Sequence, residues 1–166
     1  AHLLLGTDTG LLVSGNGGRK WDRVATAQLF GAVFAVAFLP DGKSALCTTP
    51  GGVYRLDGSE WQQASAPTEA APARAIAFGA APGRVYLIGR RDLYQSNDAG
   101  RSFVKVEHGL PDQAEITELA VSVLPDDVLY AIADGRPLVS RDSGRTWQQR
   151  TSGLPDDQPL FVVRED

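Results

Sequence analysis

The side chains of this sequence that could recognise a charged ligand lie in short segments rich in glycine and proline. Arg90 and Arg91 are the most suggestive pair, because a planar guanidinium binds a carboxylate or a phosphate through parallel hydrogen bonds. The other candidates from such segments are Asp8, His108, Asp134 and Arg136. Recognition concentrates in loops held by a rigid framework, so we expect a binding surface there. The competing interpretation is a set of solvated turns with ordinary surface charges.

Residues typical of a catalytic or metal site do not form a recognisable set. Aspartate and glutamate total 20, but a glycoside hydrolase needs only two carboxyl groups, so their number predicts no activity. His2, His108 and Cys47 are too few to build a zinc site, and a single cysteine excludes an intrachain disulfide. No nucleophile elbow, His-Glu-x-x-His motif or P-loop is present. We therefore expect no catalytic residue, no metal and no cofactor.

One eight-residue motif, Ser-x-Asp/Asn-x-Gly-Arg-x-aromatic, occurs three times, at residues 14–21, 96–103 and 140–147. A shortened fourth copy at 55–61 keeps only Gly58 and Trp61. The aromatic positions are separated by 40, 42 and 44 residues, which indicates a repeat protein. The motif positions are Ser14, Asn16, Gly18, Trp21, Ser96, Asp98, Gly100, Phe103, Ser140, Asp142, Gly144 and Trp147.

The residue types of this motif are those of a tight hairpin. The aspartate carboxylate accepts hydrogen bonds from nearby backbone N–H groups, and glycine adopts a backbone conformation that other residues avoid. The aromatic side chain would then bury apolar area between neighbouring sheets. We expect a structural role for Asp98 and Asp142, with a metal or substrate site as the alternative. The shortened copy predicts a hairpin turn at Asp57-Gly58.

Each repeat contains four short segments with the character of β-strands. The first is an apolar run at 34–38, 74–78, 118–122 and 160–164, which we expect to be fully buried and close to a central axis. The second strand is expected at 2–6, 44–48, 84–88 and 128–132, and the third at 10–14, 52–56, 92–96 and 137–140. The fourth is expected at 20–24, 60–64, 102–106 and 146–150. Four antiparallel strands per repeat of about 40–45 residues are typical of the blades of a β-propeller.

The repeated motif resembles the Asp-box, or BNR repeat, of sialidases, family 74 xyloglucanases, the sortilin ectodomain and photosystem II assembly factors. Residues 140–147 match at every position, whereas 14–21 carry Asn16 and Lys20 in place of aspartate and threonine. The resemblance implies an all-β propeller whose box residues lie at its periphery, away from the ligand. It also implies a non-catalytic scaffold that binds a protein partner or enters a larger complex. The alternative is a carbohydrate-binding or glycoside-hydrolase-like propeller, although sialidases spread their catalytic residues over six blades.

The order of the strands predicts one domain, 1–166, with units at about 1–25, 33–64, 73–106 and 116–150. The chain begins at the second strand of its first unit and ends with an additional first strand at 159–164. That last strand would complete the first unit and close a ring of four four-stranded blades. Two alternatives remain. In one, two chains exchange end strands and form an eight-bladed ring, which is a homodimer. In the other, the chain is a fragment of a larger propeller.

Composition adds few constraints on the partner. The net charge of −4 and the pI of about 5.1 argue against a sequence-independent grip on nucleic acid. No apolar run is long enough to predict a membrane span. The chain begins with Ala1, as it would after removal of a secretory signal, so we expect an extracytoplasmic location, periplasmic or secreted.

Overall fold

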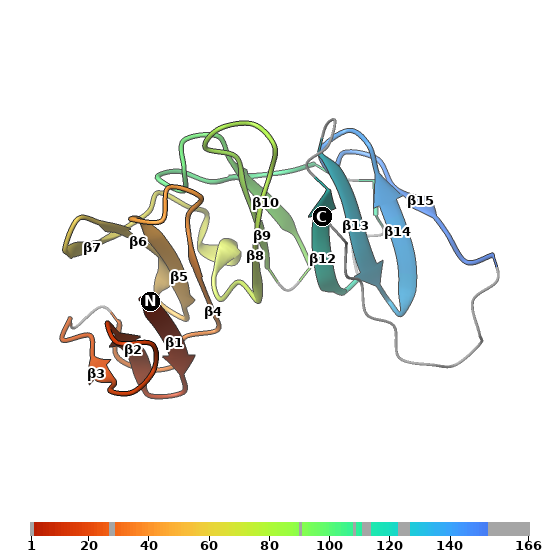
Figure 1. Ribbon diagram of the computed structural model, residues 1–166. Coiled ribbons are helices and arrows are strands. Elements are labelled where there is room, and N and C mark those ends of the chain that lie inside the picture. Colours follow the sequence, from red (N-terminus) through yellow and green to blue (C-terminus); the bar gives the residue numbers. More distant parts are fainter. Residues whose placement is uncertain are drawn as a thin grey trace.

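The computed structural model describes residues 2–26, 29–89, 91–107, 109–110, 114–122 and 127–152 (Figure 1). Its strands form four antiparallel sheets, which we call blades 1 to 4 in chain order. Blade 1 contains β1 (Leu3–Thr7), β2 (Gly10–Ser14) and β3 (Asp22–Arg23). Blade 2 contains β4 (Ala35–Phe38), β5 (Ala45–Thr49), β6 (Gly52–Asp57) and β7 (Glu60–Gln63).

The other two blades repeat the same order of strands. Blade 3 contains β8 (Ala75–Phe78), β9 (Val85–Ile88), β10 (Leu93–Ser96) and β11 (Val104–Lys105). Blade 4 contains β12 (Ile116–Ser122), β13 (Val128–Ala133), β14 (Arg136–Ser140) and β15 (Gln148–Gln149). A 3-10 helix, η2 (Thr68–Ala70), lies in the link between blades 2 and 3. The prediction of an all-β chain of antiparallel blades is confirmed, while the closing strand at 159–164 lies outside the described residues.

Turn chemistry explains where each strand ends. Gly10 and Gly52 open the third strands of their blades with φ of 142° and 143°, a conformation that favours glycine. In blade 2, Asp57 pairs with Glu60, so the two-residue turn is Gly58-Ser59. This is one residue later than the turn predicted at Asp57-Gly58. The shift follows from register, because Asp57 is still paired as the last residue of β6.

The innermost strands are less buried than the sequence predicted. All four residues of β4 and of β8 are half-buried, whereas the second strands β5 and β9 are buried along their whole length. The prediction of fully buried first strands is therefore wrong for these two blades. An innermost strand has a hydrogen-bonded neighbour on one edge only, whereas the second strand lies between two strands and between two neighbouring blades.

The four blades follow one another in an arc, with blades 1 and 4 at its two ends (Figure 1). Contacts link β1 to β4, β4 to β8 and β8 to β12, so the inner strands of consecutive blades are neighbours. Three apolar clusters occupy the spaces between consecutive blades. They include Leu11 and Cys47 between blades 1 and 2, Leu46 and Leu87 between blades 2 and 3, and Tyr86 and Leu129 between blades 3 and 4. This radial packing of sheets is the architecture of a β-propeller.

Candidate functional site

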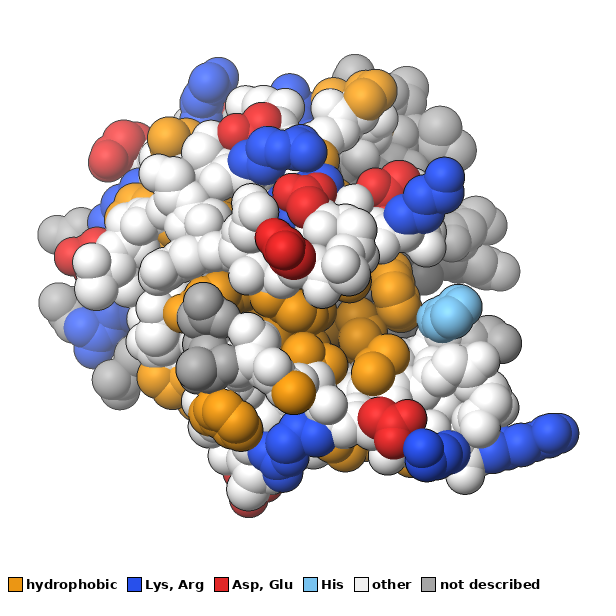
Figure 2. All heavy atoms as spheres, turned by 90° about the vertical axis from the view of Figure 1, so that its left-hand side faces the viewer, with side chains coloured by type: hydrophobic (Ala, Val, Ile, Leu, Met, Phe, Trp, Pro, Cys, Tyr) orange, Lys and Arg blue, Asp and Glu red, His pale blue; other side chains and the backbone are white. Residues whose placement is uncertain are grey.

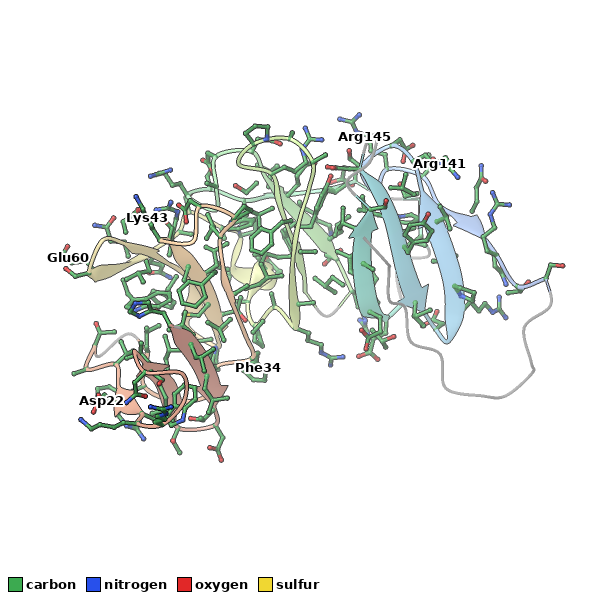
Figure 3. The ribbon with its side chains drawn as sticks, viewed as in Figure 1. Asp22, Phe34, Lys43, Glu60, Arg141 and Arg145 are labelled. Carbon is green, nitrogen blue, oxygen red and sulfur yellow. The ribbon has the colours of Figure 1, made fainter. Side chains whose placement is uncertain are left out.

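The alternation of the strands gives the molecule two faces with different loops. The turns between second and third strands emerge on one face, which we call the turn face. The links between blades reach that face where the next first strand begins, after Ser65 and Gly109 have hydrogen-bonded to the box turns of the following blades. The motif turns at 14–21, 96–103 and 140–147, which we call the box turns, emerge on the opposite face with the turns between first and second strands. Arg141 and Arg145 of the last box turn lie on the side away from Phe34, which precedes β4 (Figure 3).

Each box turn is held by the same side-chain hydrogen bonds. In the last turn Ser140 Oγ accepts from the Gly144 N–H at 2.8 Å and donates to Asp142 Oδ1 at 2.8 Å. The Asp142 carboxylate also accepts from the backbone N–H and the hydroxyl of Thr146, at 2.8 and 2.6 Å. The other two turns repeat the serine contact, in Ser96 to Gly100 and Ser14 to Gly18, both at 2.9 Å.

These hydrogen bonds stabilise the ionised carboxylate of the aspartates. Donors from the Thr146 hydroxyl and backbone and from Ser140 lower the pKa of Asp142 to about 2. For Asp98, partial burial raises the pKa, but the hydrogen bonds from Ser102 and Ser96 outweigh it and the net shift is downward. In both turns the carboxylate is already occupied by donors of its own turn. This occupancy favours a structural role for the box aspartates.

The glycines of the box turns in blades 3 and 4 lie against the preceding blade. Gly100 and Gly144 have φ of 81° and 91°. A Cβ at Gly100 would lie 2.7 Å from Leu46 Cδ2 of blade 2, and one at Gly144 would overlap Leu93 of blade 3. The box turns of blades 3 and 4 therefore approach their neighbours more closely than any residue with a side chain allows.

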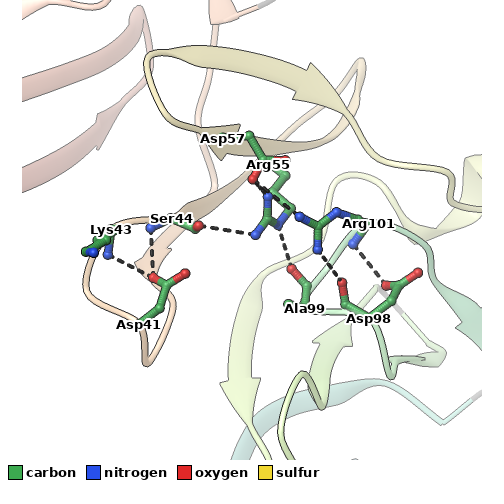
Figure 4. Close-up of polar contacts among 8 residues, drawn as sticks. All are labelled: Asp41, Lys43, Ser44, Arg55, Asp57, Asp98, Ala99 and Arg101. Atoms are coloured by element: carbon green, nitrogen blue, oxygen red, sulfur yellow. Dashed lines mark hydrogen bonds and ion pairs between the residues drawn. The ribbon is translucent and has the colours of Figure 1, made fainter.

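A buried arginine of blade 2 binds the box turn of blade 3 (Figure 4). Arg55 is only 5% exposed. Its Nε donates to the carbonyl of Ala99 in the box turn of blade 3 at 2.8 Å, and its Nη2 donates to Ser44 Oγ at 3.2 Å. The guanidinium also pairs with Asp57, which lies 3.7 Å from Arg101 of blade 3. This polar network fixes the position of the box turn relative to blade 2.

A buried carboxylate connects blades 3 and 4 on the same face. Asp127, 6% exposed, accepts hydrogen bonds from the Ala80 N–H, from Tyr86 Oη at 2.8 Å and from Arg84 Nη1 at 3.2 Å. Burial raises the pKa of Tyr86 to about 12. Because three donors of blade 3 converge on one carboxylate of blade 4, this contact holds the two blades together.

The turn face carries the candidate binding residues, in three different blades. Asp8 lies in the β1–β2 turn, Arg91 in the β9–β10 turn, and Asp134 in the β13–β14 turn, and all are exposed. Within the part of the chain that the structure describes, no hydrogen bond or ion pair joins these three residues. Arg90 and His108 lie outside the described residues.

Only Asp134 and Arg136 are brought to one site. Both line a pocket of about 310 Å³ beside blade 4. Its apolar wall comes from Leu110, Ala114, Ala133 and Leu138, and Gln149 completes it. Asp134 Oδ1 accepts from the Glu115 N–H at 2.9 Å, so that carboxylate holds the start of blade 4. Arg136 is exposed and its guanidinium has no partner among the described residues. The pocket therefore combines an apolar wall with an available cation.

Two ion pairs of the turn face were not predicted from the sequence. Arg74 Nη1 lies 2.8 Å from Glu115 Oε1 and joins the links on either side of blade 3. Lys105 Nζ lies 2.7 Å from Asp92 Oδ1. Neither pair is close in sequence, so no spacing rule could find them. Leu110 of the pocket belongs to a Gly-Leu-Pro-Asp run that recurs at 153–156. A run that recurs between units is typical of a structural link, so the sequence pattern does not indicate a binding site at Leu110.

Further hollows occur elsewhere. A pocket of about 390 Å³ on the box-turn face lies between blades 2 and 3 and is lined mainly by Leu39, Pro40, Phe78, Pro82 and Arg84. Another, of about 370 Å³, lies between the outer strands of blades 1 and 2, beside Val24, Glu60 and Trp61. The side view of the molecule shows apolar side chains gathered in a hollow rimmed by charged ones (Figure 2).

Over the described ranges, no group of three or more histidine, cysteine, aspartate or glutamate side chains is placed to hold a metal ion. The same part of the chain contains no helix long and apolar enough to cross a membrane.

The comparison with solved structures identifies the fold as that of a β-propeller. The chain superposes on an ancestral GH74 enzyme with a TM-score of 0.75 and 21% identity over 93% of its length. It superposes on YCF48 from Cyanidioschyzon merolae with a TM-score of 0.64 and 16% identity over 89%. A structure of YCF48 bound to D1 peptide gives a TM-score of 0.57 and 19% identity over 84%. No family model and no curated protein matches the sequence.

The chain is shorter than each of these proteins. It spans 24% of the GH74 enzyme and 52% of YCF48 from Cyanidioschyzon merolae. It also spans 46% of the peptide-bound YCF48 chain. At these identities the likeness shows the fold alone.

Proposed function

We propose that this chain is a non-catalytic binding module that presents the turn face of a β-propeller to a protein partner. The observation that carries the proposal is the pocket beside blade 4, where the exposed Arg136 guanidinium adjoins a wall that includes Leu110 and Leu138. A cation next to an apolar wall suits a peptide segment in which a carboxylate neighbours a large apolar side chain.

The likeness to a peptide-bound propeller supports the same proposal. The solved YCF48 structure named as bound to D1 peptide shares this fold. The rigid framework also favours binding, because strands and buried inter-blade contacts hold the turns in fixed positions and little ordering is needed when a partner docks. A protein partner or a larger complex is therefore the partner class that we propose.

Panning a displayed library of random peptides against the purified chain tests this function. We expect enrichment of peptides in which aspartate, glutamate or the C-terminal carboxylate adjoins a large apolar residue. Arg136→Glu should weaken the selected peptides at least about tenfold, because it replaces an attractive charge by a repulsive one. The matched control is the exposed Arg141→Glu in the last box turn (Figure 3), which should leave affinity unchanged. Equal losses in both variants, or no enrichment, would refute the proposal.

Carbohydrate binding is the second candidate, and the superposition on a GH74 enzyme favours it. A glycan array together with a panel of chromogenic glycosides separates the two functions. Glycan binding that Arg136→Glu abolishes would assign the same pocket to a sugar acid. Turnover of a glycoside would replace the binding proposal by an enzymatic one.

Three finer assignments belong to the same proposal. We infer that the box turns are Asp-box turns, on the evidence of their shared serine, aspartate and glycine hydrogen bonds. An extracytoplasmic location is supported by the likeness to the extracellular domain of BT4673 from B. thetaiotaomicron, with a TM-score of 0.67 and 14% identity. That likeness covers 90% of this chain and 20% of the other. The domain and unit boundaries predicted from the repeats stay part of this proposal.

A further inference from the structure

The first box turn, at 14–21, differs from the other two at the residue that its hydrogen bonds surround. Asn16 occupies the place that Asp98 and Asp142 occupy in blades 3 and 4. Its side-chain oxygen has the equivalent donors, because Ser14 Oγ donates to Asn16 Oδ1 at 3.0 Å and the Lys20 N–H donates to it at 2.9 Å. An amide therefore lies in a turn whose contacts suit a carboxylate.

The amide nitrogen of Asn16 is the atom that this turn does not hold. In the other two turns the second carboxylate oxygen accepts from a hydroxyl, that of Ser102 at 2.5 Å and that of Thr146 at 2.6 Å. The first turn has Lys20 at that place, which carries no hydroxyl, and its ammonium pairs with Asp22 at 2.9 Å. Asn16 Nδ2 has no hydrogen-bond partner in the described part of the chain, whereas Oδ1 has two donors.

The residue after Asn16 leaves its side chain open to attack by the backbone. Gly17 has no side chain, both residues are exposed to water, and a Cβ at Gly17 would have nothing within 4 Å. Ala99 holds the same place in blade 3, where its N–H donates to the Gly83 carbonyl at 2.8 Å. The Gly17 N–H has no such acceptor among the residues that the structure describes. The backbone nitrogen beside the Asn16 amide is therefore accessible and not hydrogen-bonded to them.

We propose that Asn16-Gly17 is a site of spontaneous modification, at which Asn16 is converted to aspartate and the first box is completed. The Gly17 nitrogen attacks Asn16 Cγ, a nitrogen–carbon bond forms, and Nδ2 leaves as ammonia with the proton that the Gly17 nitrogen loses. The product of this step is a five-membered cyclic imide. Water then adds to Cγ and breaks the new bond, which restores the backbone and leaves a carboxylate. The sum of the two steps is the hydrolysis of one side-chain amide.

The two donors to Asn16 Oδ1 favour both steps and select the product. Each step places negative charge on this oxygen, and hydrogen-bond donors directed at such an oxygen lower the barrier. Water can open the imide at Cγ, which gives aspartate, or at the backbone carbonyl carbon, which gives isoaspartate. The Ser14 hydroxyl and the Lys20 N–H are donors to the oxygen on Cγ, so we expect aspartate to be the main product.

Asn97, the other asparagine of the chain, is an internal control. It lies one residue before the box aspartate of blade 3, so Asp98 follows it in place of a glycine. The Asp98 N–H donates to Ser96 Oγ at 3.2 Å, and Asn97 Oδ1 accepts from Gln95 Nε2 and Arg84 Nε at 3.0 and 3.2 Å. The nitrogen that would attack Asn97 is therefore both hydrogen-bonded and shielded by a side chain, so we expect Asn97 to persist.

Peptide mapping by mass spectrometry, during incubation of the folded chain at neutral pH, tests the proposal. Asn16 should gain the mass that separates an amide from a carboxylic acid, take up heavy oxygen from labelled water, and co-elute with the peptide of Asn16→Asp. Asn97 should convert at least about tenfold more slowly in the same molecule, because no glycine follows it. Gly17→Ala should also slow the conversion of Asn16 at least about tenfold. This variant fits the turn, because Ala99 has φ of 59° at the same place in blade 3.

The same measurement on the chain unfolded in guanidinium chloride separates the effect of the turn from that of the dipeptide. Without donors on the Cγ oxygen, isoaspartate should predominate, whereas the folded chain should give mainly aspartate. Enzymatic methylation specific for isoaspartate measures the ratio of the two products. An Asn16 that stays intact in the folded chain while the unfolded chain converts would overturn the proposal, as would equal conversion of Asn97 or equal product ratios in the two states.

Completion of the box should also be visible in stability. Asn16→Asp should unfold at a higher temperature than freshly purified wild type, because a charged acceptor strengthens the hydrogen bonds from Ser14 and Lys20. Thermal unfolding followed by circular dichroism compares the two chains. A lower transition temperature for Asn16→Asp would contradict the claim that the conversion completes the box.

Discussion

Most of the carboxylates in the described part of the chain bind groups of the protein itself. Asp142 and Asp98 hold box turns, Asp127 joins two blades, and Asp134 holds the start of blade 4. An aspartate count therefore says little about ligands here. Among the candidate residues that the structure describes, Arg136 stands out because it lines a pocket without an internal partner.

Removing the Asp142 carboxylate should weaken the last box turn. Asp142→Ala deletes the acceptor for Thr146 and Ser140, so we expect the free energy of unfolding to fall by about 1 kcal/mol, since the group is solvent-screened. Urea denaturation measures the change. Asp8→Ala, in an exposed turn, is the control and should shift stability by less than about 0.5 kcal/mol.

Acid should weaken the same turn in a predictable range of pH. The pKa of Asp142 is lowered to about 2 in the folded protein, from an ordinary value of 3.8. A lowered folded-state pKa contributes stability that is present above the ordinary value and lost as the pH falls through about 2. Asp142→Asn should therefore show a smaller fall in unfolding free energy between these pH values than the wild type. Asn16 already occupies this position in the first box turn, where its oxygen accepts from the Lys20 N–H at 2.9 Å.

Loss of the buried Asp127 carboxylate should cost more than loss of Asp142. Asp127→Ala leaves Tyr86 Oη and Arg84 without their acceptor in a buried site. We expect a fall of about 2–4 kcal/mol in the free energy of unfolding. Asp41→Ala, an exposed turn aspartate with two backbone donors, is the comparison and should lose about 1 kcal/mol or less. Similar losses in the two variants would contradict the role assigned to Asp127.

At the scale of elements, the box turn joins a strand hairpin to the neighbouring blade. The glycine has a positive φ for the hairpin and no side chain for the contact, so one residue satisfies two constraints. The aromatic residue that follows packs into the same inter-blade cluster, as Phe103 does. The motif is therefore a local turn whose glycine and aromatic ring are also tertiary contacts.

The two constraints on the box glycine can be separated by a pair of variants. Gly144→Ala adds a Cβ that overlaps Leu93, whereas Gly135→Ala adds one with nothing within 4 Å. Both residues have positive φ, 91° and 70°, so both variants carry backbone strain of about 1 kcal/mol. Only Gly144→Ala should lose a further 1–3 kcal/mol or so through overpacking. Equal losses in thermal unfolding would show that the blade contact is unimportant.

For the whole molecule, stability resides between the blades rather than within them. The largest apolar clusters each combine residues of two blades, and the second strands β5 and β9 are buried because a neighbour lies on each side. Because neighbouring blades share their apolar clusters, loss of one inter-blade contact destabilises both blades. We therefore expect the blades to unfold together.

Equivalent leucines of different blades should therefore differ in their contribution. Leu87 is fully buried between blades 2 and 3, so Leu87→Ala should cost about 2–5 kcal/mol. Leu5 occupies the same position of blade 1 and is 44% exposed, so Leu5→Ala should cost less than about 1 kcal/mol. Chemical denaturation at protein concentrations where the mass is that of one chain gives both values. A large loss at Leu5 under these conditions would mean that a further segment of the same chain covers it.

The repeat was visible in the sequence because local constraints produce it. A positive φ needs glycine, a tight turn needs an acceptor for its N–H groups, and a buried strand needs apolar residues, so these features recur in the three complete copies of the motif, whereas the shortened copy keeps only Gly58 and Trp61. The β-propeller architecture followed from this period, and the structure and its likeness to solved propellers confirm that fold. The hairpin of blade 2 was placed one residue early because its register depends on the pairing of Asp57 with Glu60.

The sequence by itself determined the period, the kind of sheet and the residues of each turn, because all of these depend on neighbours within a few positions along the chain. Only the tertiary structure decided which strands are most buried and which charges find partners. Arg55 and Ala99, or Asp127 and Tyr86, are about forty residues apart and meet only because consecutive blades pack side by side. Burial and polar pairing in this protein are properties of the packing between blades, and no single repeat contains that information.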